Sequence, residues 1–194
     1  TLGNHAFGSR DIGSFLDDRS DVIIRPANFP AQNPGCGYTV TEVQGVRVLC
    51  INMLGTVNLA PLDNPFLTME RILDAQKGKY DIAVLDMHAE ATSEKYAMAR
   101  AFAGKVSVIF GTHTHVQTAD EGILPRGSGY ITDLGMSGPV HSILGTKIEA
   151  VLTKMRYHMP AHFTVAEGEI AICGALFTID PSTGKCVKVE RIKF

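Results

Sequence analysis

Histidines are the residues of this 194-residue chain best suited to do chemistry. His113 and His115 are separated by one residue and follow an apolar run, Val106–Phe110, whose residue types predict a strand buried in a parallel sheet and ended by Gly111. Two neutral imidazoles at this spacing on a tight loop can turn toward one cation. An isolated His-Thr-His is as easily a pair of surface histidines, so the other histidines of the chain must decide between these interpretations.

A second apolar run, Asp81–Met87, delivers His88 at its end. Between the two runs, residues 92–102 have the pattern of a helix, so the three segments predict a strand–helix–strand unit with parallel strands. Because parallel strands end at the same edge of a sheet, we expect His88 to lie close to His113 and His115.

The loop Gly3-Asn4-His5 adds an amide oxygen and another imidazole, and we expect it to follow a further strand ending at Leu2. Imidazole nitrogens with an amide oxygen suit zinc, manganese or iron better than magnesium or calcium. Asp86 would point to the same side of its strand as His88, either as a ligand or to orient an imidazole. We expect Glu90 to be solvated and Glu94 to be a first-turn helix acid. Three other histidines are expected on the surface or in packing: His141, His158 and His162.

The rest of the pattern predicts an α/β fold with an antiparallel carboxyl-terminal third. Further helices are predicted over Asp11–Asp18, Leu67–Ala75 and Ile148–Met155. Further strands are predicted at Val22–Ile24, in a hairpin of Gly37–Val43 with Val46–Ile51, in a hairpin within Gly122–Thr132, and over Phe163–Phe177 and Val187–Ile192.

Composition excludes several classes of protein. The net charge is −2, from 18 basic and 20 acidic residues without a long run of either sign, which argues against a double-stranded DNA-binding protein. No apolar run approaches the roughly 20 residues that cross a bilayer, so we expect no membrane association. The four cysteines form no Cys-x-x-Cys pair and are expected to be reduced thiols in a cytoplasmic protein.

Taken in order, these loops resemble the signature of calcineurin-like metallophosphoesterases. The resemblance is closest to their YmdB-like branch, the 2′,3′-cyclic-nucleotide 2′-phosphodiesterases. It implies an α/β fold, a two-sheet αββα sandwich of the metallophosphoesterase type, with two metal ions, iron or manganese, between the sheets. The motifs that carry it are Gly3-Asn4-His5, Arg25–Asn28, Asp86–Lys95, Gly111–Asp120 and Tyr130–Met136.

The resemblance also implies roles for individual residues. Asn4, His88 and His113 would ligate one metal and His115 the other. His5 would be the general acid that protonates the departing ribose oxygen while a metal-bound hydroxide attacks. The substrate would be a small phosphoester, such as an RNA-derived cyclic nucleotide.

The family has a first segment of several dozen residues that supplies an aspartate and a bridging glutamate. This chain begins at Thr1 in the middle of an element, and it has Ala6-Phe7-Gly8 where the branch carries Thr-Trp-Asp. We therefore expect one metallophosphoesterase domain over residues 1–194, lacking its amino-terminal strand or strands, with one metal or none and little phosphodiesterase activity. Such a domain would cover its open edge as a homo-oligomer or with the missing segment.

Two other functions stay open at this point. The first is a truncated, catalytically weak relative that acts as a binding or regulatory subunit. The second, ranked lower, is a metal-dependent amidohydrolase, because the His-x-His pair of that class usually lies on the first strand of a barrel. Metal content would separate the enzyme from the regulatory subunit.

Overall fold

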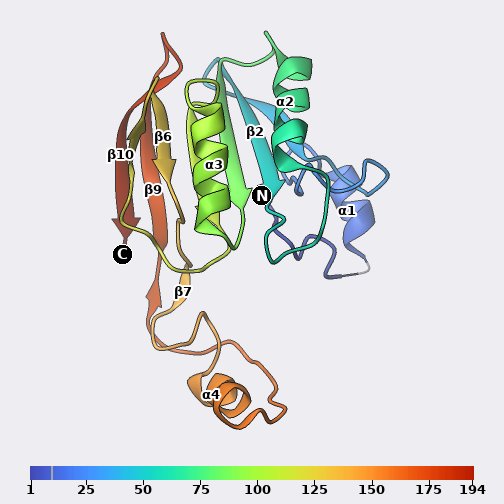
Figure 1. Ribbon diagram of the computed structural model, residues 1–194, viewed down its shortest axis with the longest axis vertical. Coiled ribbons are helices and arrows are strands. Elements are labelled where there is room, and N and C mark those ends of the chain that lie inside the picture. The colour runs from blue at the N-terminus through green and yellow to red at the C-terminus, as the bar shows by residue number, and fades with distance from the viewer. Residues whose placement is uncertain (10) are drawn as a thin grey trace.

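A central sheet of six strands organises the chain in this computed structural model, which describes residues 1–9 and 11–194 (Figure 1). The strand order is β1-β2-β3-β4-β6-β5, and β2, β3, β4 and β6 run parallel while β1 and β5 pair antiparallel at the edges. The strands are β1 (Tyr38–Val43), β2 (Val46–Leu54), β3 (Ile82–His88), β4 (Val108–Thr112), β5 (Gly122–Leu124) and β6 (Ser128–Ile131).

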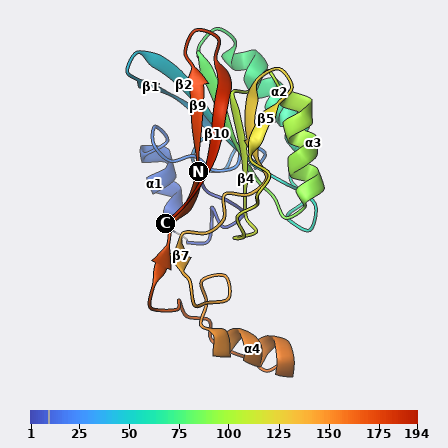
Figure 2. The same ribbon diagram turned by 90° about the vertical axis from the view of Figure 1, so that its left-hand side faces the viewer.

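Helices cover one face of this sheet and a second sheet covers part of the other (Figures 1 and 2). The helices are α1 (Ile12–Asp18), α2 (Pro65–Gln76), α3 (Thr92–Phe102) and α4 (Ile148–Tyr157), of which α2 and α3 lie on the central sheet. Strands β9 (Cys173–Asp180) and β10 (Lys185–Lys193) form the antiparallel second sheet. At Gly129 of β6 an added Cβ would collide with Cys186 and Phe177, so the two sheets are in direct contact. The α/β fold with two sheets is confirmed.

The hydrophobic core lies between the central sheet and helices α2 and α3. Its fully buried side chains include Leu49, Ile51, Met53, Met69, Leu85, Met87, Met98 and Ile109. Burial of a side chain of this size contributes about 1.5–3 kcal/mol, so the register of the central strands is strongly fixed. In that register His88 of β3 lies opposite Thr112 of β4, so both strands end at one edge. The predicted strand–helix–strand unit is confirmed.

Strand β4 begins two residues later than predicted and does not end at Gly111. Val106 makes only an isolated bridge with Ala103. Gly111 lies inside the strand, where a Cβ would overlap the carbonyl of Thr132 and the side chain of Lys95. The glycine is therefore there for close packing, and our prediction that it ends the strand was wrong.

The other strand predictions have mixed outcomes. The β1–β2 hairpin is confirmed, and its turn residues Gln44 and Gly45 have φ of 52° and 81°, as a two-residue hairpin turn requires. The β5–β6 hairpin is also confirmed. Residues 22–24 are not a strand: Val22 is 57% exposed, and the segment makes one ladder-like bond, from Leu2 N to Ile24 O. Regular pairing after Phe163 starts only at Ile170.

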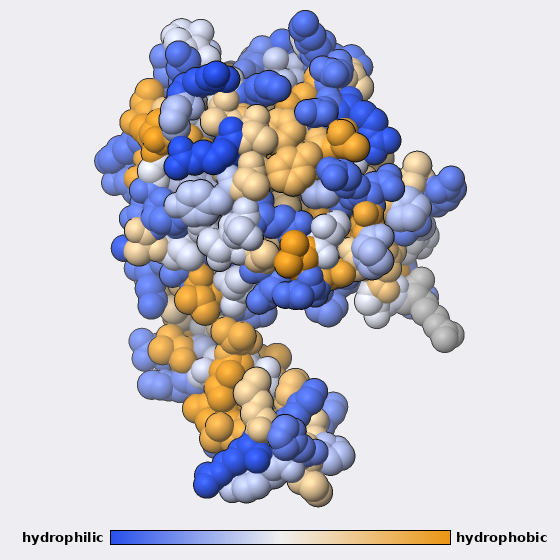
Figure 3. Space-filling view, viewed as in Figure 1, coloured by the Kyte–Doolittle hydropathy of each residue, from blue (hydrophilic) through white to orange (hydrophobic). Residues whose placement is uncertain are grey.

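Residues 138–171 form a lobe that projects from the two sheets (Figures 1 and 2). It contains α4 and the short pair β7 (Gly138–Pro139) and β8 (Ile170–Ala171). Only Val151 of α4 is buried. Apolar side chains are exposed on this lobe (Figure 3), and the most exposed are Met155, Tyr157, Met159, Val165 and Ile170. The lobe has almost no core of its own.

Within the described residues, no helix has the length and apolar character needed to span a membrane. All four cysteines are described, and each is a free thiol.

Candidate active site

The ends of β3 and β4 bring three predicted ligands into contact. The Nε2 of His88 lies 3.0 Å from Oδ1 of Asn4 and 3.1 Å from Nδ1 of His113. The two imidazole rings are 4.9 Å apart and nearly perpendicular. The parallel register therefore does what the sequence predicts: it places His88 and His113 together, and the loop after Leu2 adds Asn4.

Thr112 fixes the orientation of His88. Its hydroxyl donates to Oδ1 of Asp86 at 2.7 Å, and the same hydroxyl oxygen lies 2.9 Å from Nδ1 of His88. Because Thr112 has one hydroxyl proton and Asp86 receives it, Nδ1 of His88 is the donor of the second bond. A neutral His88 then carries its lone pair on Nε2. Asp86 thus orients the imidazole through Thr112.

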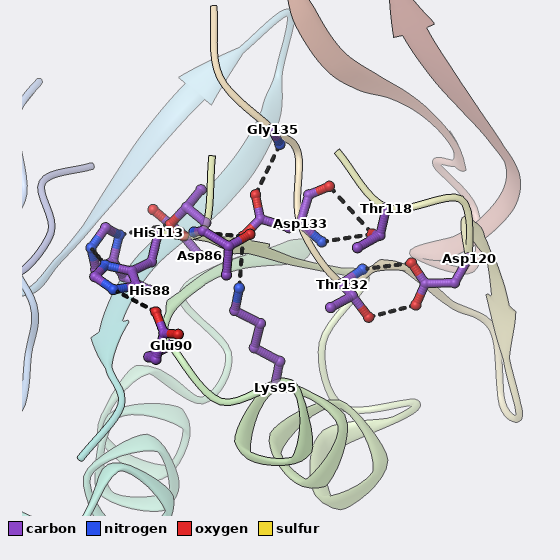
Figure 4. Close-up of polar contacts among 12 residues, drawn as sticks. Asp86, His88, Glu90, Lys95, His113, Thr118, Asp120, Thr132, Asp133 and Gly135 are labelled. Atoms are coloured by element: carbon purple, nitrogen blue, oxygen red, sulfur yellow. Dashed lines mark hydrogen bonds and ion pairs between the residues drawn. The ribbon is translucent and has the colours of Figure 1, made fainter. Parts of the chain in front are cut away.

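Glu90 fixes His113 in the same way. Its Oε2 lies 3.1 Å from Nε2 of His113 (contact drawn in Figure 4), so that nitrogen donates. In the neutral imidazole, Nδ1 then keeps the lone pair. We expected Glu90 to be merely solvated; its side chain is half exposed, but it holds this imidazole. When both imidazoles are neutral, three lone pairs, on His88, His113 and Asn4, therefore face one another.

Gly3 is as necessary to the cluster as the polar residues. A Cβ at this position would overlap the imidazole of His88. The glycine therefore lets the backbone before Asn4 pass directly against the ring, which is what brings the Asn4 amide within reach of Nε2.

His115 and His5 are exposed, unlike His88 and His113. His115 lines a pocket of about 270 Å³ together with His88, His113 and Met136. His5 lies in the turn that follows Asn4, near enough for its positive charge to contribute to the lowered pKa of His88. The structure therefore brings Asn4, His88, His113 and His115 together and leaves His5 exposed in the turn directly after Asn4.

Electrostatics keep His88 neutral. Burial is the main cause that lowers the pKa of His88 to about 4, and the positive charge of Lys95 acts in the same direction. Burial also raises the pKa of Asp86. A neutral imidazole is the form that binds a metal.

The His-Thr-His loop has an unfavourable backbone that a buried ion pair supports. His113 and His115 have φ of 105° and 66°, a region that costs residues other than glycine on the order of 1–3 kcal/mol. Between them, Thr114 donates its N–H and its hydroxyl to Oδ2 of Asp133, at 3.1 and 2.8 Å. The same oxygen accepts from Nζ of Lys95 at 2.7 Å (Figure 4). This support was not anticipated from the sequence.

Glu94 is a first-turn acid of α3, as expected, and it has a further role. It is 9% exposed, and its carboxylate accepts from the N–H groups of Thr56 and Val57 and from the Thr56 hydroxyl. It therefore binds the loop after β2 to the start of α3. The histidines outside the signature, His141, His158 and His162, are exposed, as expected.

The donor set fits one cation. In the described part of the chain no group of three or more His, Cys, Asp or Glu side chains is arranged to hold a metal. The converging lone pairs of Asn4, His88 and His113 include an amide oxygen, and they suit a borderline divalent ion. A second ion on His115 stays a prediction, since the imidazole of His115 makes no contact with a carboxylate among the described residues.

Comparison with solved structures assigns the fold to phosphoesterases of the metallophosphoesterase type. The whole chain superposes on a crystal structure of a hypothetical protein from Thermus thermophilus, with a TM-score of 0.92 and 36% sequence identity, covering 100% of this chain and 74% of that chain. It also matches the crystal structure of a novel phosphatase from Mycoplasma pneumoniae, with a TM-score of 0.90, 36% identity, and 99% and 70% of the two chains covered.

The chain belongs to the family of YmdB-like proteins, whose sequence model matches residues 1–192. It is 44% identical over 192 residues to the 2′,3′-cyclic-nucleotide 2′-phosphodiesterase of Bacillus subtilis strain 168, covering 99% of this chain and 72% of that protein. These relatives are named as a phosphodiesterase and a phosphatase, so the family is one of phosphoesterase-type enzymes. The resemblance inferred from the sequence motifs is confirmed.

Proposed function

We propose that the protein is a metal-dependent phosphodiesterase that opens 2′,3′-cyclic nucleotides at the 2′ ester and leaves the phosphate on the 3′ oxygen. The observation that carries this proposal is the meeting of three lone pairs, from Asn4, His88 and His113, at the edge where β3 and β4 end. The substrate class follows the name of the relative from Bacillus subtilis.

Asn4, His88 and His113 would hold one divalent cation, and His115 would contribute to a second. A cation bound there would polarise a phosphoryl oxygen of the substrate and offset the negative charge that develops on it. Asp86 and Glu90 act through their hydrogen bonds, because they keep the ligand nitrogens of the two imidazoles unprotonated.

His5 would be the general acid. When the bond between phosphorus and O2′ breaks, a ribose alkoxide is a poor leaving group, and a proton from the His5 imidazolium to O2′ would speed this step by about 10²–10⁴-fold. The exposed position of His5 on the solvent side of the cluster leaves it free to exchange its proton between turnovers.

Hydrolysis of 2′,3′-cyclic AMP, with the products separated by chromatography, tests the proposal. We expect adenosine 3′-phosphate, loss of turnover with a chelator, and a loss of about 10²–10⁴-fold in His5→Ala at unchanged metal content. His158→Ala, an exposed histidine outside the cluster, is the matched control. Loss of metal together with activity in His5→Ala would make His5 a ligand, and absence of metal-dependent turnover would favour a regulatory subunit.

We also propose that the projecting lobe pairs with a second copy of the chain. Leu152, Met155 and Ile148 of α4 are exposed apolar side chains on a helix that buries only Val151. Sedimentation of the double variant Leu152→Asp/Met155→Asp should show a smaller species than the wild type, whereas Glu149→Gln should not change it. A wild-type protein that is monomeric at all concentrations would contradict this pairing.

A further inference from the structure

A cleft of about 560 Å³ opens beside the histidine pocket. His115 and Met136 line both cavities, so the cleft is continuous with the place where the imidazoles gather. Binding sites for small molecules typically have volumes of about 300–1,000 Å³. The size and the position of this cleft suit the part of a substrate that extends away from the reacting phosphate.

One wall of the cleft is apolar. It consists mainly of Met136, Val140 and Leu144, and the latter two are about half exposed. A nucleobase has flat apolar faces, which such a wall can cover without desolvating charged groups.

The walls are tied together by hydrogen bonds. The Gln117 amide donates to the carbonyls of Gly174 and Ile192, both at 2.9 Å, and so joins the loop after His115 to β9 and β10. On the other side, Ser142 donates to the carbonyl of Pro139 at 2.6 Å and accepts from the N–H of Gly145 at 2.9 Å. These hydrogen bonds make the cleft a preformed feature of the fold.

The lining of the cleft also carries positive charge from the end of β10. Arg191 is engaged by Oε1 of Glu121 at 3.7 Å and by the carbonyl of Thr118 at 3.3 Å. Lys193 also lines the cleft, is exposed, and has no ion-pair partner among the residues described. Lys193 is thus the cation that remains available to an anionic group of a ligand.

We propose that this cleft binds the nucleoside of the substrate, with the base against Met136, Val140 and Leu144 and a 5′-phosphoryl group at Lys193. This inference rests on the proposed function, because it orients the substrate from the histidine pocket outward. It narrows the substrate class to 2′,3′-cyclic phosphates whose ribose carries a 5′-phosphoryl group. That group is either a terminal monoester or the internal phosphate of an oligoribonucleotide.

Binding of the reaction products tests the inference without requiring turnover. Calorimetry would compare adenosine 3′,5′-bisphosphate with adenosine 3′-phosphate. We expect the bisphosphate to bind about fivefold more tightly, the size of an exposed ion pair, and expect this preference to weaken with added salt. Lys193→Met should abolish the preference. Lys188→Met should keep it, because Lys188 lies on the same strand but pairs with Glu190 and does not line the cleft.

Equal affinity for the two products, no binding of the bisphosphate, or an unchanged preference in Lys193→Met would each overturn the inference. A bulky acidic change on the apolar wall, Val140→Glu, should weaken both products equally, since it acts on the base; an unchanged affinity in that variant would also contradict the assignment.

Turnover then separates this inference from the proposed function. Cyclic substrates would be compared with and without a 5′-phosphate, together with a dinucleotide ending in the cyclic phosphate. A lower KM for either phosphorylated substrate supports the cleft assignment, and a gain for the dinucleotide alone assigns Lys193 to an RNA strand. Equal KM values with normal turnover would overturn the assignment of the cleft but not the proposed phosphodiesterase function. Tighter binding of the bisphosphate without any turnover would support the assignment of the cleft and refute the proposed phosphodiesterase function.

Discussion

The Nζ of Lys95 lies 2.7 Å from Oδ2 of Asp133, and both side chains are 1% exposed. The pair joins α3 to the segment after β6, and the same carboxylate oxygen accepts both bonds from Thr114. A buried charge without a partner lowers the free energy of unfolding, so Asp133 needs Lys95. Because the same carboxylate holds Thr114, the ion pair also supports the His-Thr-His loop.

Lys95→Met should strongly destabilise the protein. It leaves the carboxylate of Asp133 buried without its counter-charge, which typically costs about 3–5 kcal/mol. Urea unfolding would measure this loss. The double variant Lys95→Met/Asp133→Leu should regain much of the stability but not the hydrolytic activity, because Thr114 has then lost its acceptor. Wild-type activity in the double variant would show that the pair is only structural.

Thr112→Val should weaken metal binding while leaving the fold in place. Valine has nearly the same shape but cannot join Asp86 to Nδ1 of His88, so the imidazole loses the bond that fixes its tautomer. Loss of such a partner typically costs about 10–100-fold in metal affinity. Competition with a metal indicator would measure it. Thr112→Ser, which keeps the hydroxyl, should restore affinity; a serine variant as weak as the valine variant would contradict the assigned role.

Gly3→Ala should disrupt the cluster without unfolding the protein. The added Cβ would meet the His88 ring, which must then move away from Asn4. We expect reduced metal binding with a nearly unchanged melting temperature. Gly174→Ala is the control, because its Cβ would meet nothing within 4 Å. Normal metal binding in Gly3→Ala would mean that His88 is not a ligand.

Stability at acid pH should depend on the Arg47–Asp81 pair. Hydrogen bonds from the Arg47 side chain and backbone lower the pKa of Asp81 to about 2, below its value of about 3.9 in an unfolded chain. A lowered folded-state pKa stabilises the protein above the unfolded pKa, and this contribution is lost as the pH falls toward 2. Arg47→Met should therefore be less stable than the wild type at pH 7 but not at pH 2. A pH-independent difference between the two in urea unfolding would contradict this.

The convergence of His88 and His113 could be predicted from the sequence because it follows from topology alone. Two apolar runs joined by a helix are usually parallel neighbours in one sheet, and parallel strands end at the same edge. The same reasoning predicted wrongly that Gly111 ends β4. In a sequence, a glycine required for close packing inside a strand cannot be distinguished from a glycine that ends the strand. Here the neighbours are Thr132 and Lys95, which come from distant parts of the chain.

The supporting contacts could not be predicted from the sequence. Glu90 and Glu94 lie four residues apart beside the start of α3, and both have the residue type of a solvated acid. One contacts an imidazole and the other a loop after β2, because tertiary packing decides what each carboxylate faces. The buried ion pair of Lys95 could not be predicted either, because lysine is rarely buried and its partner Asp133 lies 38 positions away in the sequence.

The binding of Mn²⁺ to the purified protein, measured by equilibrium dialysis, tests the central claim most directly. If the lone pairs of Asn4, His88 and His113 hold a cation as proposed, the wild type and His158→Ala should bind Mn²⁺, whereas His88→Ala and His113→Ala should lose it. The same Mn²⁺ content in the wild type and in both cluster variants, or no Mn²⁺ in any of them, would contradict the claim.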